Sequence, residues 1–266
     1  MGASSPSGYW FSPAVWGFEL FFRPWMHHRL GGIHLAGLPD DLPEDRAVIL
    51  ASNHVSWWDG FLLREVHRRA DPGVPLFTLM GDEERRKRSF FRALGVVGLD
   101  GDVGTLRRAI RTLRTRRKRG PIWLSMFPQG EIRPSWSRPL GMRRGLAFFA
   151  RLLEPAIVLP VAIHLEPLDR PGPTAFVHGG SPIELATDRR LDVDDVERAV
   201  ERALDCIYAH LDRHGEASAS AWPPADRPEG EEGGSAPLSP VVPRGRPSGR
   251  PLLVSDRPVI QTRSTS

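Results

Sequence analysis

The sequence predicts an α/β fold in which a mixed, mostly parallel central sheet of about seven strands is flanked by helices. Apolar runs of strand length, such as residues 47–51, end in polar loops. Helical patterns separate these runs, as at residues 104–119, and this alternation is typical of parallel sheets. The chain has 266 residues, of which 40% are hydrophobic, enough for the core of one large domain.

The predicted elements alternate through residues 32–214, which we expect to form the α/β domain. Strands are expected at residues 32–37, 47–51, 74–80, 95–99, 121–126, 157–165 and 174–180. Helices are expected at residues 60–70, 104–119, 141–153 and 191–214.

An aromatic-rich segment, residues 1–31, precedes this domain. Its tryptophans and phenylalanines are followed by basic residues, a pattern that suits an amphipathic helix in the headgroup layer of a membrane. The same pattern also fits a helix docked on the protein's own core. Charged residues and prolines interrupt it, which argues against a transmembrane helix, and no signal-peptide pattern is present. Residues 215–266 are rich in Pro, Gly, Ser and Arg and are expected to form a disordered tail.

His54 and Asp59 stand in a predicted strand-to-helix loop, after the apolar run 47–51. Such loops reach the C-terminal edge of an α/β sheet, where substrates bind. Asp59 could accept the Nδ1 hydrogen of His54 and leave Nε2 free as a general base. The alternative is that Asp59 only caps the following helix and His54 has no chemical role.

The Asn-His-x4-Asp pattern at residues 53–59 is followed by Phe-Pro-Gln-Gly-Glu-Ile-Arg at 127–133 and Gly-Met-Arg-Arg-Gly at 141–145. In order and spacing, these segments resemble the glycerophosphate and lysophospholipid acyltransferases. Two further blocks of that family, residues 95–101 and 158–163, can also be aligned. The resemblance spans residues 33–185. It implies that His54 and Asp59 are catalytic, and that substrates are bound by Phe127, Pro128, Gln129, Gly130, Glu131, Arg133, Arg143 and Arg144.

This sequence departs from the family pattern at several positions. Many relatives have a lysine where Met80 or Gly81 stands, and an arginine for the acceptor's phosphate where Gly101 stands. The common family form also has Glu at the position of Gln129 and Thr at that of Glu131. These differences argue against an ordinary lysophosphatidate acceptor.

Positive charge is concentrated in one part of the chain. The formal net charge is only +4, but residues 85–119 hold 13 Arg or Lys against two Asp. A solvated helix face is one interpretation, and a surface for anionic headgroups or an acidic acyl carrier is another. No nucleic-acid partner is expected, because the helix at 104–119 has no aromatic side chains among its arginines.

The sequence therefore predicts a peripheral or monotopic O-acyltransferase at the cytoplasmic face of a membrane. The donor would be acyl-CoA or acyl-carrier protein, and the acceptor the hydroxyl of a lysophospholipid or another lipid. No cofactor or metal is expected, and no Gly-x-Ser-x-Gly pattern of a serine hydrolase occurs. Cys206, the single cysteine, is expected to be buried and inert. The alternative is an inactive relative that binds anionic membranes or, less favoured, nucleic acid.

Overall fold

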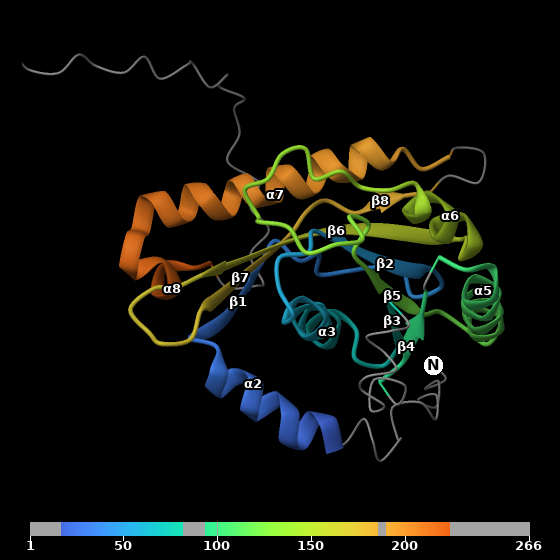
Figure 1. Cartoon of the computed structure of the whole chain (residues 1–266), viewed down its shortest axis with the longest axis horizontal. Coiled ribbons are helices and arrows are strands. Elements are labelled where there is room, and N and C mark those ends of the chain that lie inside the picture. Colours follow the sequence, from blue (N-terminus) through green and yellow to red (C-terminus); the bar gives the residue numbers. More distant parts are fainter. Residues whose placement is uncertain (1–16, 82–93, 100, 186–189, 224–266) are drawn as a thin grey trace, which may run out of the picture. The chain divides into compact units, whose positions relative to one another are not determined.

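The computed structural model describes residues 17–81, 94–99, 101–185 and 190–223. Its centre is an eight-stranded sheet in the order β1-β7-β6-β2-β5-β3-β4, with β8 paired to β6 (Figure 1). The strands are β1 (Gly32–Ala36), β2 (Ala47–Ser52), β3 (Leu76–Met80), β4 (Val96–Gly98), β5 (Trp123–Met126), β6 (Ala156–Glu166), β7 (Thr174–Gly179) and β8 (Ile183–Glu184). β7 and β8 pair antiparallel to β6, and the other pairs are parallel. The predicted mixed, mostly parallel sheet is confirmed.

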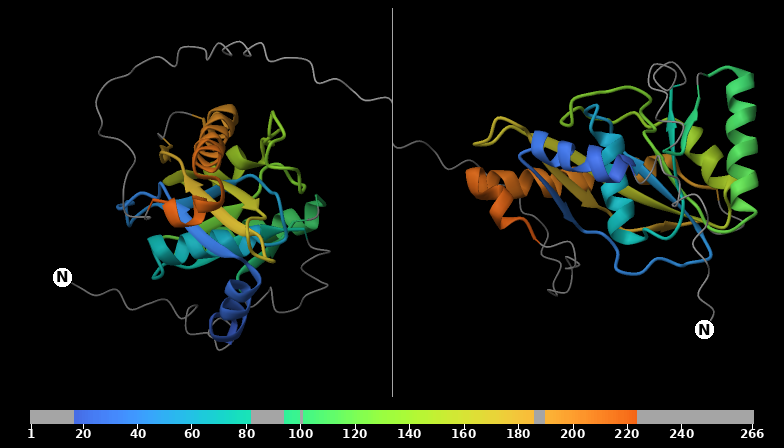
Figure 2. Two further views of the ribbon diagram at one scale, coloured as in Figure 1. Left: turned by 90° about the vertical axis from the view of Figure 1, so that its left-hand side faces the viewer. Right: turned by 90° about the horizontal axis from the view of Figure 1, so that it is seen from below.

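Helices cover both faces of the sheet (Figures 1 and 2). They are α2 (Arg23–Arg29), α3 (Asp59–Ala70), α5 (Val103–Arg117), α6 (Gly145–Leu152), α7 (Val193–His214) and α8 (Ser218–Ala221), with a π-helical turn η1 (Phe18–Phe22) and a 3-10 turn η3 (Gly215–Ala217). α3 and α2 lie on one face, and α6 and α7 lie on the other. Each helix therefore needs only one apolar stripe.

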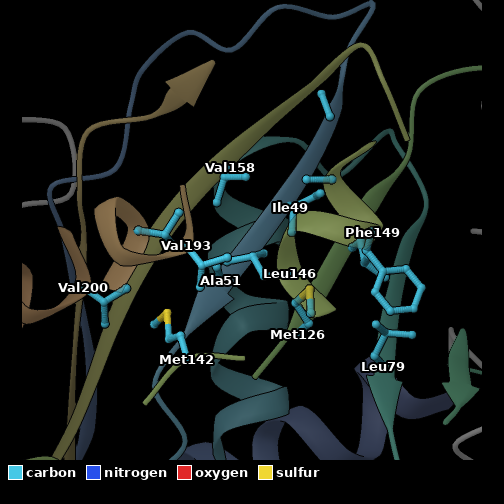
Figure 3. Close-up of a cluster of buried hydrophobic side chains, with 14 of the residues drawn as sticks. Ile49, Ala51, Leu79, Met126, Met142, Leu146, Phe149, Val158, Val193 and Val200 are labelled. Carbon is cyan, nitrogen blue, oxygen red and sulfur yellow. The ribbon is translucent and has the colours of Figure 1, made fainter. Parts of the chain in front are cut away.

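β2 is the central strand, and its six residues are all buried. Alternate side chains of a strand point to opposite faces. Ile49 and Ala51 accordingly pack with α6 and α7, while Val48 and Leu50 pack with α3. Figure 3 shows the first of these clusters, in which Leu146 of α6 lies beside Ile49 and Ala51, and Val193 and Val200 of α7 lie further to the left. Burial on both faces explains the continuous apolar run in this part of the sequence.

The register of the parallel strands brings two polar loops together. Ala51 of β2 is paired with Met126 of β5, so both strands end at the same edge of the sheet. The loop between β2 and α3 and the loop between β5 and α6 therefore emerge side by side. This pairing positions the candidate site.

The N-terminal segment is described from residue 17. Met26 is buried against the α3 side of the core, and Arg23 forms an ion pair with Glu65 of α3 at 2.8 Å. Hydrogen bonds from Arg23 and Arg68 outweigh burial and lower the pKa of Glu65, so this contact favours the ionised carboxylate. In the same segment, Phe21 is 73% exposed. Its helices thus dock on the core along one side and present apolar side chains to solvent along another.

The C-terminal boundary differs from the predicted residue 214. The chain continues through η3 and α8, and the Trp222 ring packs on Phe176 of β7 at 5.0 Å between centroids. The packed domain therefore extends at least to Trp222, because an aromatic side chain there covers the sheet. Residues 224–266 of the predicted tail 215–266 lie outside the described residues, as do residues 1–16 and the basic run 85–88.

Two further predictions concerned the single cysteine and the absence of a transmembrane helix. Cys206 lies on the exposed side of α7 and is not buried, since the apolar stripe of this helix is formed by neighbours such as Leu204 and Ile207. Among the described residues, no helix is both long and apolar enough to cross a membrane.

Candidate active site

The imidazole of His54 and the carboxylate of Asp59 are in direct contact. His54 Nδ1 lies 2.7 Å from Asp59 Oδ2. The Asp59 side chain is completely buried, whereas that of His54 is 24% exposed. A buried carboxylate next to Nδ1 favours a hydrogen on this nitrogen, which leaves Nε2 as the basic atom.

The loop itself holds Asp59 in place. Its Oδ2 also accepts hydrogen bonds from the backbone N–H of Val55 at 2.6 Å and of Ser56 at 2.9 Å, and its Oδ1 accepts from the Ser56 hydroxyl at 2.5 Å. Asp59 is the first residue of α3, where the helix dipole favours negative charge. Asp59 therefore both favours the start of α3 and contacts His54.

Asn53 fixes the loop to the neighbouring strand. Its amide donates to the Ile163 carbonyl at 2.9 Å and accepts from the Ile163 N–H at 2.8 Å. The Asn53 side chain thus pairs with β6 just beyond the last residue of β2. It therefore fixes the point at which the backbone leaves the sheet and the position of His54, the next residue.

Gln129, from the second loop, lies under the first. It is 3% exposed, and its Oε1 accepts from the His54 N–H at 2.7 Å while its Nε2 donates to the Leu140 carbonyl at 3.0 Å. A carboxylate, the common family group at this position, could accept the first bond but could not donate the second. The side chain is used within the fold, so its difference from the family does not bear on the acceptor.

The rest of the second loop orients His54 and shapes the space around it. The Phe127 ring stacks on the imidazole with centroids 4.2 Å apart, and the Arg133 N–H donates to the His54 carbonyl at 2.8 Å. Gly130 has φ of +76°, and a Cβ there would lie 2.9 Å from the Arg143 guanidinium. Only glycine combines this backbone conformation with so close an approach.

Of the remaining predicted binding residues, some line the cavity and others do not. Pro128, Glu131 and Arg143 line the cavity described below. The Arg133 guanidinium is turned to its own loop, where Nη1 donates to the Leu140 carbonyl at 3.3 Å. Arg144 is exposed at the start of α6 and is not part of the cavity lining.

Polar side chains, of which Ser135 and His164 are buried, support the second loop from behind. The Ser135 hydroxyl and His164 Nδ1 are 2.8 Å apart, and His164 Nε2 lies 2.8 Å from the Glu166 carboxylate. Glu197 of α7 accepts from the N–H groups of Gly141 and Met142. No pattern in the sequence predicts the Ser135 and Glu197 contacts, since these residues are far along the chain from their partners.

His54 faces a cavity of about 950 Å³ that runs between the sheet, α3, α5 and α6. Its lining is mainly apolar and includes Trp57, Leu76, Leu79, Met80, Leu106, Met126, Leu146 and Phe149. Gly101 also lines it, and a Cβ there would meet no atom within 4 Å, so the position of the family's arginine is open space. Arg64 of α3 also lines the cavity. The sequence did not predict this, because the helical pattern around Arg64 indicates only which apolar side chains face the core.

Trp57 and Trp58 have different positions. Trp57 lines the cavity and is 38% exposed. Trp58 does not line it and packs against Trp25 of α2 with centroids 5.5 Å apart. Within the described residues, no group of His, Cys, Asp and Glu side chains could hold a metal ion.

This geometry is that of an α/β enzyme with a histidine–carboxylate pair at the C-terminal edge of its sheet, facing a large apolar cavity. The profile of the family described as Acyltransferase matches residues 37–164. This range contains both loops of the site and ends at His164. In these residues the chain resembles the acyltransferase family.

A solved structure shares this fold. It is the crystal structure of the 1-acyl-sn-glycerophosphate (LPA) acyltransferase, PlsC, from Thermotoga maritima, with a TM-score of 0.54 and 23% identity over 73% of this chain and 80% of that one. No curated protein sequence matches the chain.

Proposed function

We propose that this protein transfers a fatty acyl group from a thioester, either acyl-CoA or acyl-carrier protein, to the hydroxyl of a lysophospholipid-like or other lipid acceptor. The observation that carries the proposal is the contact between His54 and Asp59 at the wall of an apolar cavity. Such a cavity suits an acyl chain, and an imidazole suits removal of a hydroxyl proton.

The chemical step needs no covalent enzyme intermediate. His54 Nε2 takes the proton of the acceptor hydroxyl as its oxygen attacks the thioester carbonyl carbon. The tetrahedral intermediate then expels the thiolate, which takes the proton back from the imidazolium, so that an ester and a free thiol leave. Asp59 stabilises the imidazolium and holds the ring, as the carboxylate does in catalytic triads.

The oxyanion of this intermediate needs hydrogen-bond donors. In the second loop, the Gly130 N–H donates to the Phe127 carbonyl at 3.0 Å and is therefore already used. The next N–H, that of Glu131, has no acceptor among the described residues and belongs to a cavity-lining residue. We assign it to the oxyanion.

The acceptor's anionic group would bind Arg64 and Arg143, because these arginines line the cavity while Arg133 is turned to its own loop. Gly101 leaves space where the family's arginine would stand. This arrangement favours an acceptor other than lysophosphatidate. The exposed Leu20, Phe21 and Trp25 of the N-terminal helices would hold the enzyme at the cytoplasmic surface of a membrane.

The test is thiol release from palmitoyl-CoA and from palmitoyl-acyl-carrier protein, with a panel of lysophospholipids and glycolipids and with the product identified by mass spectrometry. Wild-type protein is expected to form an acylated lipid, and His54→Ala is expected to form none while still sedimenting with anionic vesicles. Vesicle binding without acyl transfer by wild-type protein, over the whole panel, would support the membrane-binding alternative instead.

A further inference from the structure

One face of α5 carries a row of cationic side chains. Arg107, Arg111, Arg114 and Lys118 follow one another at intervals of three or four residues along the helix and its C-cap, and all four are exposed. They surround a surface hollow that is distinct from the catalytic cavity. We refer to these four residues as the α5 stripe. At 1.5 Å per residue, the row extends over about 16 Å.

The α5 stripe is not used to hold the fold. Within the described part of the chain, no carboxylate lies within 4.0 Å of any of its four side chains. Arg117 of the same helix is different, since it donates to the carbonyls of Asp45, Leu153 and Pro155. Like charges three or four residues apart repel each other and destabilise a helix. An anionic partner bound to the stripe would neutralise this repulsion between the four cationic side chains.

The α5 stripe has few of the apolar groups that a membrane surface would require. Beyond Val103 in the first turn, Ile110 is the one apolar side chain of α5 that reaches the hollow, where it is half-buried, and Ala109 and Leu113 are fully buried. The exposed aromatic residues Phe21 and Trp25 belong instead to the N-terminal helices, and Figures 1 and 2 show α2 well apart from α5. Insertion into lipid therefore fits the N-terminal helices, and a soluble anionic partner fits α5.

The position of α5 connects the stripe to the chemistry. Leu106, next to Arg107 in the chain, lines the cavity that contains His54, and so does Gly101 just before the helix. A partner bound to the α5 stripe would therefore lie beside the cavity wall. The length of the row favours a protein with a line of carboxylates over the phosphates of CoA, which are confined to one end of that molecule.

We propose that the α5 stripe is the docking surface for an acidic acyl-carrier protein, which delivers the acyl thioester to the cavity. The proposal rests on the proposed function and makes the carrier protein, rather than CoA, the preferred donor. Complementary charge mainly accelerates association and makes it dependent on salt.

The test compares Arg107→Glu/Arg111→Glu and Arg114→Glu/Lys118→Glu with wild-type protein, with palmitoyl-acyl-carrier protein and palmitoyl-CoA as alternative donors. Each double variant is expected to raise KM for the carrier-protein donor at least about tenfold, as loss of electrostatic steering allows. The kcat with either donor and the KM for palmitoyl-CoA should change less than about twofold, because charges at the edge of an interface act on association.

Two controls keep the result specific. Arg202→Glu/Arg213→Glu reverses the same number of exposed charges on α7 and should leave both donors unaffected. Direct binding of fluorescently labelled holo-acyl-carrier protein, measured by anisotropy at low and high salt, does not depend on turnover. It separates failure of this proposal from failure of the proposed function.

Several outcomes would overturn the docking proposal. One is carrier-protein binding that is unchanged in both stripe variants, and another is an equal rise in KM for palmitoyl-CoA, which would assign the stripe to the nucleotide. Loss of sedimentation with phosphatidylglycerol vesicles in the stripe variants would assign it to the membrane. Weakened carrier binding with unchanged vesicle binding is the result that the proposal requires.

Discussion

The two loops that form the candidate site are stabilised in different ways. In the first loop, Asp59 is held by bonds from residues no more than five positions away. In the second, distant residues take part: the Gln129 side chain accepts from the N–H of His54, and the backbone N–H of Gly141 donates to Glu197. A loop built from local bonds has a recognisable sequence motif, whereas a loop held by distant partners does not reveal which side chains face the substrate.

The largest effect is expected from Asp59→Asn, which changes the first loop alone. The amide can no longer stabilise an imidazolium, and its N–H₂ competes for the bond that fixes the His54 tautomer. We expect kcat to fall by about 10²- to 10⁴-fold, with KM for the acyl donor little changed. Steady-state kinetics of thiol release measures this, and circular dichroism checks that the fold is intact.

The second loop is tested by replacing Gln129 with Leu and, separately, with Glu. Leu leaves the buried His54 N–H without its acceptor, and one such unsatisfied group costs about 1–3 kcal/mol. Glu keeps this bond and loses only the one to Leu140, whose carbonyl also accepts from Arg133. Urea unfolding should therefore rank stability as wild type, then Glu, then Leu. An inverted order of the two variants would mean that Gln129 does not act through His54.

Gly130→Ala should have an intermediate effect. The positive φ alone costs an L-residue about 1–2 kcal/mol, and the new Cβ would displace the Arg143 guanidinium. Because Arg143 lines the cavity, we expect KM for the acceptor to rise more than kcat falls. Gly145→Ala, at a helical glycine with no atom within 4 Å of a Cβ, is the matched control for stability and should leave the free energy of unfolding unchanged.

The smallest effect is expected from Ser135→Ala, which removes one bond of the support behind the second loop. A single buried hydrogen bond contributes about 1 kcal/mol, and His164 keeps its contact with Glu166. Thermal unfolding should show a small decrease in stability and unchanged KM for the donor. A loss of activity as large as that of Asp59→Asn would give Ser135 a chemical role that this account denies.

The sequence was sufficient for the sheet and for the first loop, because both depend on local patterns. The apolar run of β2 and the spacing from His54 to Asp59 lie within a dozen residues. It was less informative about the second loop, where the buried Gln129 side chain bonds within the fold and the half-exposed Arg133 guanidinium donates to the carbonyl of Leu140. Arg64 and Glu197 were not predicted, since their positions depend on how helices pack against loops that are distant in sequence.

The central claim is that His54 and Asp59 act as one unit on the reacting hydroxyl. A double-mutant cycle in kcat, with His54→Ala, Asp59→Asn and both together, tests it most directly. The account predicts that the double variant is no slower than His54→Ala alone, because the carboxylate has no role once the imidazole is gone. If the two losses multiplied instead, the residues would act independently and the proposed mechanism would be contradicted.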